Sequence, residues 1–187
     1  MHFTLTDLVV DIAQNACQSG AKLVELEVKE NDQEFSFLVR DDGKGMTPEE
    51  IDMAVDPFLD DGEKHPHRKL GLGIPLLIQT AQQSGGGWDT QSKKGQGTTA
   101  KAWFDMKNVD TPPIGDLPDT FRTVLMFEGP QDIVIRRSLQ ADGKEPVNYE
   151  VRKSQIVATL GNLNEVGTLI LLGKYLNSLE DPDEYDE

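Results

Sequence analysis

The first forty residues of the chain show two different hydrophobic spacings. Thr4 or Thr6 can cap a helix that runs to about Cys17. Within this segment, apolar residues recur every three or four positions, as on one helical face. These residues are Leu8, Val9, Ile12, Ala13 and Ala16. Residues 24–28 instead alternate apolar and acidic side chains, and in 35–39 Phe35, Phe37 and Val39 alternate with Ser36 and Leu38. Alternation on both sides of an Asn-Asp turn predicts an antiparallel pair of strands.

The middle of the chain predicts two helices and a hairpin. A short helix begins at Thr47, because Pro48 suits the first turn and Glu50 completes a capping box. Residues 71–84 read as a buried helix entered through glycines. Residues 88–91 and 98–104 predict a hairpin.

The pattern changes after residue 107. Residues 108–119 hold three prolines and predict a connector. Beyond it we expect paired strands at 121–128 and 131–138 and a helix at 164–179, whereas 147–160 is ambiguous. The predicted domains are therefore 1–107, a small α/β segment at 120–179, and an acidic tail at 180–187.

Composition narrows the class of protein. Hydrophobic residues make up 37% of the 187 residues and charged residues 27%, which suits a globular chain with a sizeable core. The net charge of -15 argues against nucleic acid and membranes as partners. Cys17 is the only cysteine, so an internal disulfide or a zinc site made of cysteines is excluded. We see no signal peptide and no bilayer-spanning run, and therefore expect a cytoplasmic protein.

Two groups of polar residues lie where chemistry is plausible. Asp11 and Asn15 are four residues apart and share a helix face, where they could hold a hydrated Mg²⁺ or orient a water. Two polar residues on a solvated helix flank would look the same. Asp41-x-Gly43-x-Gly45 follows a strand, where a carboxylate can accept from an exocyclic amine and glycines let a flat base approach. An ordinary Asp-Gly turn is the alternative.

Two glycine motifs follow. Gly71-Leu72-Gly73 opens a helix, whose free N–H groups and dipole suit phosphates, although close packing alone also favours glycine there. The sequence Gly95-Gln96-Gly97-Thr98-Thr99 lies in the predicted hairpin, and alone it fits a turn followed by a β-branched strand start.

The order and spacing of these motifs resemble the GHKL superfamily, which includes gyrase B, MutL, histidine kinases and anti-sigma serine kinases. The segment from Leu8 to Met46 is similar to the start of the MutL and gyrase B ATPase domains. Asp56-Pro57-Phe58 followed by Gly71-Leu72-Gly73-Ile74 resembles the F and G2 boxes of histidine kinases, and residues 95–99 resemble their G3 box. The resemblance covers about residues 5–105.

The resemblance implies an α/β two-layer sandwich of the Bergerat type, with a mixed sheet covered by helices on one face. It also implies ATP with Mg²⁺. Asp41 would accept from the adenine amine with help from Thr99, and Asn15 would coordinate the metal. Residues 56–69 would form the ATP lid. The remaining implied nucleotide contacts are Gly43, Gly45, Met46, Gly71, Leu72 and Gly73, with Lys64, Arg68 or Lys69 on the γ-phosphate.

One departure affects the expected activity. Members of the superfamily that hydrolyse ATP have Glu where this chain has Asp11, and the shorter side chain would hold a water about 1 Å out of place. Asp11 is nevertheless the candidate base. No segment resembles a domain with a phospho-accepting histidine.

Three functions remain open. We expect first a regulatory ATP-binding protein whose lid closure controls a protein partner, with Asp11 as the base if a serine is phosphorylated. The alternatives are a slow ATPase of the MutL and gyrase B kind, and a non-catalytic module with structural ATP. The partner is not identifiable from the sequence, and a homodimer is left open.

Overall fold

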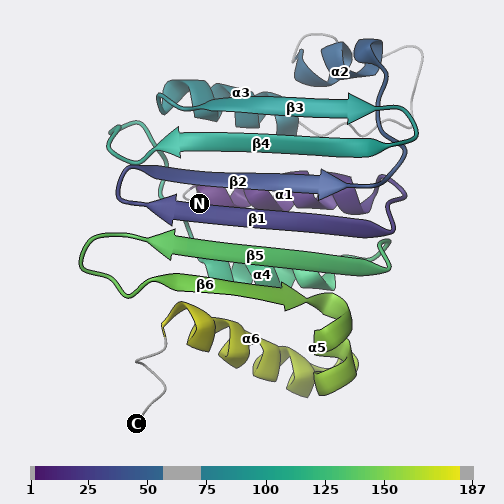
Figure 1. The fold of residues 1–187 in the computed structure, drawn as a ribbon, viewed down its shortest axis with the longest axis vertical. Helices are drawn as coiled ribbons and strands as arrows, with labels where there is room; N and C mark the ends of the chain where they lie inside the picture. The colour runs from purple at the N-terminus through teal and green to yellow at the C-terminus, as the bar shows by residue number, and fades with distance from the viewer. Residues whose placement is uncertain (1–2, 57–72, 182–187) are drawn as a thin grey trace.

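The fold is a six-stranded mixed sheet with helices against one face (Figure 1). The computed structural model describes residues 3–56 and 73–181. The strands are β1 (Leu23–Asn31), β2 (Glu34–Asp41), β3 (Gly87–Lys93), β4 (Gly97–Asp105), β5 (Asp132–Gln140) and β6 (Val147–Arg152). The helices of these residues are α1 (Leu5–Cys17), α2 (Pro48–Val55), α3 (Gly73–Gln83), α4 (Leu117–Met126), α5 (Lys153–Leu160) and α6 (Val166–Glu180).

The strand order explains the mixed character of the sheet. The order is β3-β4-β2-β1-β5-β6, and every neighbouring pair is antiparallel except β1 with β5. The parallel pair runs from Leu23 opposite Asp132 to Asn31 opposite Gln140. The C-terminal strands therefore extend the same sheet as the N-terminal ones, and the crossover from β4 to β5 carries α4.

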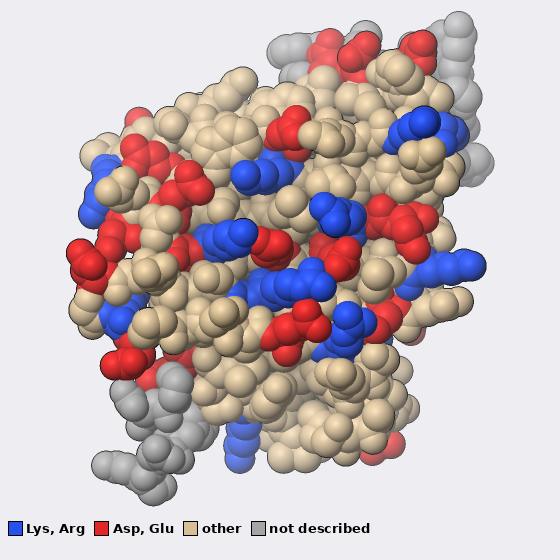
Figure 2. All heavy atoms as spheres, in the orientation of Figure 1, with Lys and Arg blue, Asp and Glu red and all other residues tan. Residues whose placement is uncertain are grey.

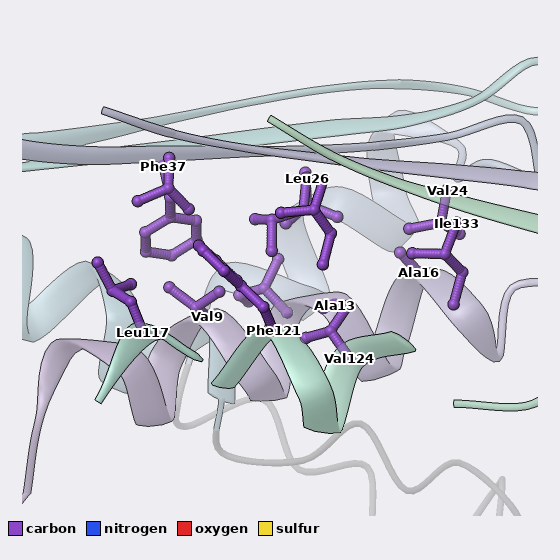
Figure 3. Packing of buried hydrophobic residues seen from close by; sticks show 14 of the residues in the cluster. Val9, Ala13, Ala16, Val24, Leu26, Phe37, Leu117, Phe121, Val124 and Ile133 are labelled. Carbon is purple, nitrogen blue, oxygen red and sulfur yellow. The ribbon is translucent and has the colours of Figure 1, made fainter. Parts of the chain in front are cut away.

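The two faces of the sheet differ in chemistry because strand side chains alternate. Val24, Leu26 and Val28 of β1 are fully buried on the helix side. There they meet the apolar faces of α1 and α4, from which Val9 and Phe121 point toward the strands (Figure 3). Burying side chains of this size stabilises the fold by about 1.5–3 kcal/mol each. This arrangement confirms the predicted two-layer α/β fold.

The opposite face of the sheet has no covering helix in Figure 1, and Figure 2 shows interleaved acidic and basic side chains over it. Some of these charges pair across strands. Arg136 of β5 contacts Glu25 at 2.9 Å and Glu150 at 2.8 Å. This face is therefore solvated, and the cavity described below lies on the other side.

Local sequence signals account for most of the elements. The predicted capping box of α2 is present, since Glu50 N–H donates to Thr47 Oγ1 at 3.2 Å and Thr47 N–H donates to Glu50 Oε2 at 3.0 Å. The hairpin of β3 and β4 and the antiparallel pair of β1 and β2 also form as predicted. No helix among the described residues is long and apolar enough to cross a bilayer.

The predicted strand at 121–128 is wrong, because residues 117–126 form α4. Asp116 caps this helix by accepting from Asp119 N–H at 2.9 Å, and a proline follows in the first turn. Phe121, Val124 and Leu125 are buried at helical spacing. Their β-branched and aromatic neighbours suggested a strand, but the contacts of α4 with α1 and α6 favour the helix. The ambiguous segment 147–160 divides into β6 and α5.

Candidate nucleotide site

A cavity of about 370 Å³ opens between α1, the helix-side face of β2 and β4, and the loop before α2. It collects four of the residues singled out in the sequence: Asn15, Asp41, Gly45 and Met46. Its apolar walls are Ile12, Ala16, Val39, Ile74, Leu77 and Ala100. A cavity with apolar walls and a few polar groups at fixed positions is typical of small-molecule sites.

Asp41 supplies the most constrained polar group of the cavity. It is the last residue of β2, and only 7% of it is exposed. Its Oδ1 accepts from Gly43 N–H at 2.9 Å and from Ser19 Oγ at 3.0 Å. Burial raises the pKa of the Asp41 carboxyl, and donation from the backbone N–H of Gly43, from Ser19 and from the backbone N–H of Thr98 offsets part of this.

The glycines beside Asp41 are required by close approaches. A Cβ at Gly43 would overlap Ser19 Oγ and would lie 2.8 Å from Asp41 Oδ1. Gly45 has φ +61°, and a Cβ there would overlap the carbonyl of Lys93. The Asp-x-Gly-x-Gly motif is therefore more than an Asp-Gly turn, because its glycines let the loop pack on Ser19 and on the β3–β4 turn.

The two threonines of the Gly95-Gln96-Gly97-Thr98-Thr99 motif point to opposite faces of the sheet. Thr98 pairs with Asp41 in the sheet register and lines the cavity. Thr99 pairs with Arg40, and strand alternation places both on the opposite face. Thr99, predicted to assist at the adenine edge, is therefore not brought to the cavity, whereas its neighbour Thr98 is.

The Ser92 side chain links strand β4 to the loop that precedes α2. Its hydroxyl lies 2.8 Å from Thr98 Oγ1 and accepts from Met46 N–H at 2.8 Å. Sequence reasoning missed Ser92, and it also missed Ser19. The signal for Ser92 was available only through the hairpin register, which places it opposite Thr98.

Helix α1 contributes the amide side chain of Asn15 to the cavity, and the carboxylate of Asp11 lies outside the cavity lining. Asn15 lines the cavity and is exposed to solvent. Asp11 lies one turn earlier, beside the start of α3: a Cβ at Gly73 would be 3.3 Å from Asp11 Cβ and 3.6 Å from its Oδ2. Burial raises the pKa of the Asp11 carboxyl, and the charge of Asp7 adds to this. Asp11 and Gly73 do not line the cavity themselves, but the structure places them together, next to the cavity residues Asn15 and Ile74.

Several predicted residues lie outside the described residues. These are Lys64, Arg68, Lys69, Gly71 and Leu72. Within residues 3–56 and 73–181, no three histidine, cysteine or carboxylate side chains gather as a metal-binding group. The Asn15 amide oxygen is a hard donor of the kind Mg²⁺ accepts together with phosphate oxygens, so the residues present fit a metal that is held mainly by a nucleotide.

Cations also line the rim of the cavity. Lys94 pairs with Glu50 at 2.9 Å, and both residues lie in the cavity wall with Lys44. Lys44 belongs to the Asp-x-Gly-x-Gly segment but was not singled out in the sequence. The Glu50 partner of Lys94 reduces the positive field that a ligand would meet there.

Comparison with known proteins agrees with this geometry. Residues 3–108 match the model of the family described as histidine kinase-, DNA gyrase B- and HSP90-like ATPases. No curated protein sequence matches the chain. Among solved structures, the crystal structure of the N-terminal domain of a DNA repair protein is similar, with 12% identity and a TM-score of 0.49. The match covers 89% of this chain and 58% of that one, so this chain spans little more than half of that length. The family match includes every described residue of the Asp11, Asp41 and Gly73 motifs, and the chain therefore belongs to the histidine kinase-, DNA gyrase B- and HSP90-like ATPases.

Proposed function

We propose that this chain is a regulatory ATP-binding protein, in which Mg²⁺-ATP binds in the cavity and closure of residues 56–69 over the phosphates controls a protein partner. The observation that carries the proposal is the buried Asp41 carboxylate, held at Oδ1 by Ser19 and Gly43 and facing an apolar cavity. A fixed acceptor at the edge of an apolar slot is what recognition of an amino-purine requires.

In this proposal the adenine lies at the base end of the cavity, which we define by Asp41 and Thr98 together with Ser92, which does not line the cavity but contacts the Thr98 hydroxyl. Val39 and Ala100 from the sheet and Ile74 and Leu77 from α3 provide apolar contacts for the ring. The Thr98 hydroxyl, already engaged with Ser92, would assist at the base edge directly or through water. Asp41 would accept from the exocyclic amine.

The phosphates would then lie at the phosphate end, which we define by Asp11, Asn15 and Gly73. The bound Mg²⁺ would neutralise phosphate charge, with Asn15 as its protein ligand. The N–H groups at the start of α3 would face the phosphates together with Gly71 and Leu72. The lysines and arginine at positions 64, 68 and 69 would reach the γ-phosphate, a role that rests on the sequence alone.

The position of Asp11 bears on whether the bound ATP serves regulation of a partner or is hydrolysed. It lies at the phosphate end beside Gly73, so it could activate either a water or a partner's serine hydroxyl. Its raised pKa makes it a somewhat better base than an ordinary aspartate. Its short reach nevertheless favours slow hydrolysis. We therefore favour partner control, with phosphorylation of a serine as its chemical form, and retain slow ATP hydrolysis as the second candidate.

Calorimetric titration with ATP, ADP and a non-hydrolysable ATP analogue, each with and without Mg²⁺, tests nucleotide binding. We expect binding of all three nucleotides and a Mg²⁺ dependence that is strongest for the two triphosphates. A phosphate-release assay on the same preparation separates binding from turnover. Failure of all three nucleotides to bind would contradict the proposal.

Hydrogen exchange tests the regulatory part. If closure depends on contacts with the γ-phosphate, amides of residues 57–69 should gain more protection from hydrogen exchange with the ATP analogue than with ADP. Amides of β5, far from the cavity lining, provide the internal control. Equal protection by both nucleotides would leave ATP binding intact but remove the switch.

A further inference from the structure

The Ser92 hydroxyl has three polar neighbours but only one proton to donate. It accepts from Met46 N–H at 2.8 Å, and its oxygen lies 2.8 Å from Thr98 Oγ1 and 3.1 Å from the carbonyl oxygen of Gly97. A serine hydroxyl donates one hydrogen bond and accepts up to two. Ser92 can therefore donate to Gly97 or to Thr98, but not to both at once.

The direction of this donation determines what Thr98 presents to the cavity. Two hydroxyl oxygens 2.8 Å apart need one proton between them, because facing lone pairs repel each other. When Ser92 donates to Gly97, that proton comes from Thr98, which then turns only lone pairs toward the cavity that it lines. When Ser92 donates to Thr98, the Thr98 proton is free to point into the cavity. Thr98 is thus an acceptor in the first arrangement and a donor in the second.

An adenine bound as proposed above requires the second arrangement. Asp41 would accept from the exocyclic amine, and the ring nitrogen beside that amine has a lone pair and no proton. This lone pair needs a donor, either Thr98 itself or a water to which Thr98 donates. The contact that Ser92 gives up, with Gly97, is the longer one, at 3.1 Å against 2.8 Å. Base binding therefore favours a turn of the Ser92 proton from Gly97 to Thr98.

The hydrogen bonds of the second arrangement form a chain with a single direction. Met46 N–H donates to Ser92, Ser92 donates to Thr98, and Thr98 donates toward the base. Hydrogen bonds in such a chain polarise and strengthen one another. A base at one end of the chain should therefore strengthen the bond from Met46 N–H at the other end.

The chain starts in the loop before α2, which packs on the β3–β4 turn. In this loop, Gly95 N–H donates to the carbonyl oxygen of Lys44 at 2.7 Å. Met46 precedes Thr47, the cap of α2, and α2 leads along the sequence to residues 56–69. A change in the Met46 bond therefore acts on the segment that precedes the proposed lid.

We propose that Ser92 is a positioning residue that couples occupation of the base end to the loop before α2, by turning its proton from Gly97 to Thr98 when a base binds. This inference rests on the proposed nucleotide binding. Ser92 does not line the cavity, so it acts through Thr98 and Met46 and not by touching the ligand.

Amide signals of the full chain in NMR test the coupling, with ADP as the probe because it carries the base without the γ-phosphate. At saturating ADP, the Met46 amide proton should move downfield and exchange with solvent about threefold more slowly or less. In Thr98→Val, which interrupts the chain, ADP should still bind but the Met46 response should be lost. The Gly95 amide is the internal control, since it belongs to the same turn but not to the chain.

The outcomes separate this inference from the proposed function. ADP that binds without any response of the Met46 amide would overturn the coupling and leave nucleotide binding intact. A Met46 response that persists in Thr98→Val would also overturn it. Absence of ADP binding to the parent would overturn both.

A double-mutant cycle on ATP affinity tests the role of Ser92 itself. Ser92→Ala should weaken binding about threefold and Thr98→Val roughly fivefold, values in the range of one hydrogen bond. The double variant should be close to Thr98→Val alone, because the two hydroxyls act through one chain. A purely structural role of Ser92 through Met46 would instead weaken binding equally in both backgrounds.

Two further variants complete the cycle. Ser92→Thr keeps the hydroxyl and should bind ATP within about twofold of the parent. Gln91→Ala is the matched control, because it removes the exposed neighbouring side chain, which strand alternation places on the opposite face of β3. Additive effects of Ser92→Ala and Thr98→Val, or equal effects of Ser92→Ala and Gln91→Ala, would overturn the proposal.

Discussion

The base end and the phosphate end of the cavity differ in how completely the folded chain builds them. At the base end, Asp41 Oδ1 has two donors, and Ser92 contacts both Thr98 and Met46. At the phosphate end, the side chains of Asp11 and Asn15 are exposed and have no hydrogen bond to a described residue. The side chains that we propose to recognise the base are therefore preorganised.

This difference has an energetic consequence. A preorganised site loses little conformational freedom when its ligand binds, whereas exposed side chains must be ordered at that moment. The base end should therefore contribute affinity that is common to ATP and ADP. The phosphate end should contribute the part that depends on Mg²⁺ and the γ-phosphate. Substitutions at the two ends should be separable by their readouts.

The largest expected effect is at Asp41. Asp41→Asn should weaken ATP binding by about 1.5–3 kcal/mol, since a charged acceptor in a buried site is lost, which is roughly 10- to 150-fold in Kd. Calorimetric titration measures this directly. An unchanged ATP affinity would rule out Asp41 as the base acceptor.

The same variant should keep its thermal stability. Burial raises the pKa of Asp41 in the folded chain, so its stabilising contribution is present at low pH and is lost as pH rises through that pKa. At neutral pH the charge therefore opposes folding, and the neutral amide removes this cost while its oxygen can still accept from Ser19 and Gly43.

Asp42 is the matched control. It is exposed, and it accepts from Leu23 N–H at 2.9 Å and Lys22 N–H at 2.8 Å, which lower the pKa of its carboxyl. Its charge thus stabilises the fold at neutral pH, and this contribution is lost as pH falls through the lowered pKa. Asp42→Asn should reduce the melting temperature slightly and leave ATP affinity unchanged, the reverse of Asp41→Asn.

The sequence predicted correctly that Asp41 ends a strand and precedes spaced glycines, but it did not predict the hydrogen-bond partners of this carboxylate, and the role of Asp41 toward a base stays a prediction. Asp41, Gly43 and Gly45 could be found because a strand end followed by spaced glycines is a local pattern. Ser19 and Ser92 are joined to them only by tertiary contacts and by the register of β3 with β4. A hydroxyl with no local signal cannot be assigned to a site before that register is known.

The elements show the same division between local and tertiary signals. Strand β1 was predictable because its apolar and polar residues alternate strictly from Val24 to Val28, and β2 because Phe35, Phe37 and Val39 recur at every second position. Helix α4 was not, because its β-branched and aromatic residues also suit a strand. Its conformation is favoured by packing of Phe121 and Val124 in the core, against α1 and the sheet.

The second largest effect concerns turnover at the phosphate end. The parent chain should hydrolyse ATP more slowly than about 1 per second, a typical lower rate for enzymes, and Asp11→Glu should raise the rate about tenfold by restoring the reach of the carboxylate. Phosphate release under saturating ATP measures both rates. Gln14→Glu is the control, because it adds a glutamate to the exposed side of the same helix. Fast turnover by the parent, or equal rates for both variants, would contradict the geometric argument.

The smallest effect distinguishes the two threonines of the β4 motif. The sequence favoured Thr99 as the residue at the adenine edge, whereas the register of β2 with β4 places Thr98 beside Asp41 and Thr99 on the solvated face. Valine replaces a threonine hydroxyl with a methyl group and suits a strand equally well. Thr98→Val should therefore weaken ATP binding by about 1 kcal/mol, the usual value of one hydrogen bond, or roughly fivefold in Kd. Thr99→Val should leave the affinity within error of the parent.

The two substituted positions are adjacent and the substitutions are chemically identical. Any general effect on the strand would therefore appear in both variants, and only a position-specific contact separates them. Weaker binding by the Thr99 variant alone would mean that the base is read from the other face of the sheet, and the cavity would lose its assignment as the nucleotide site.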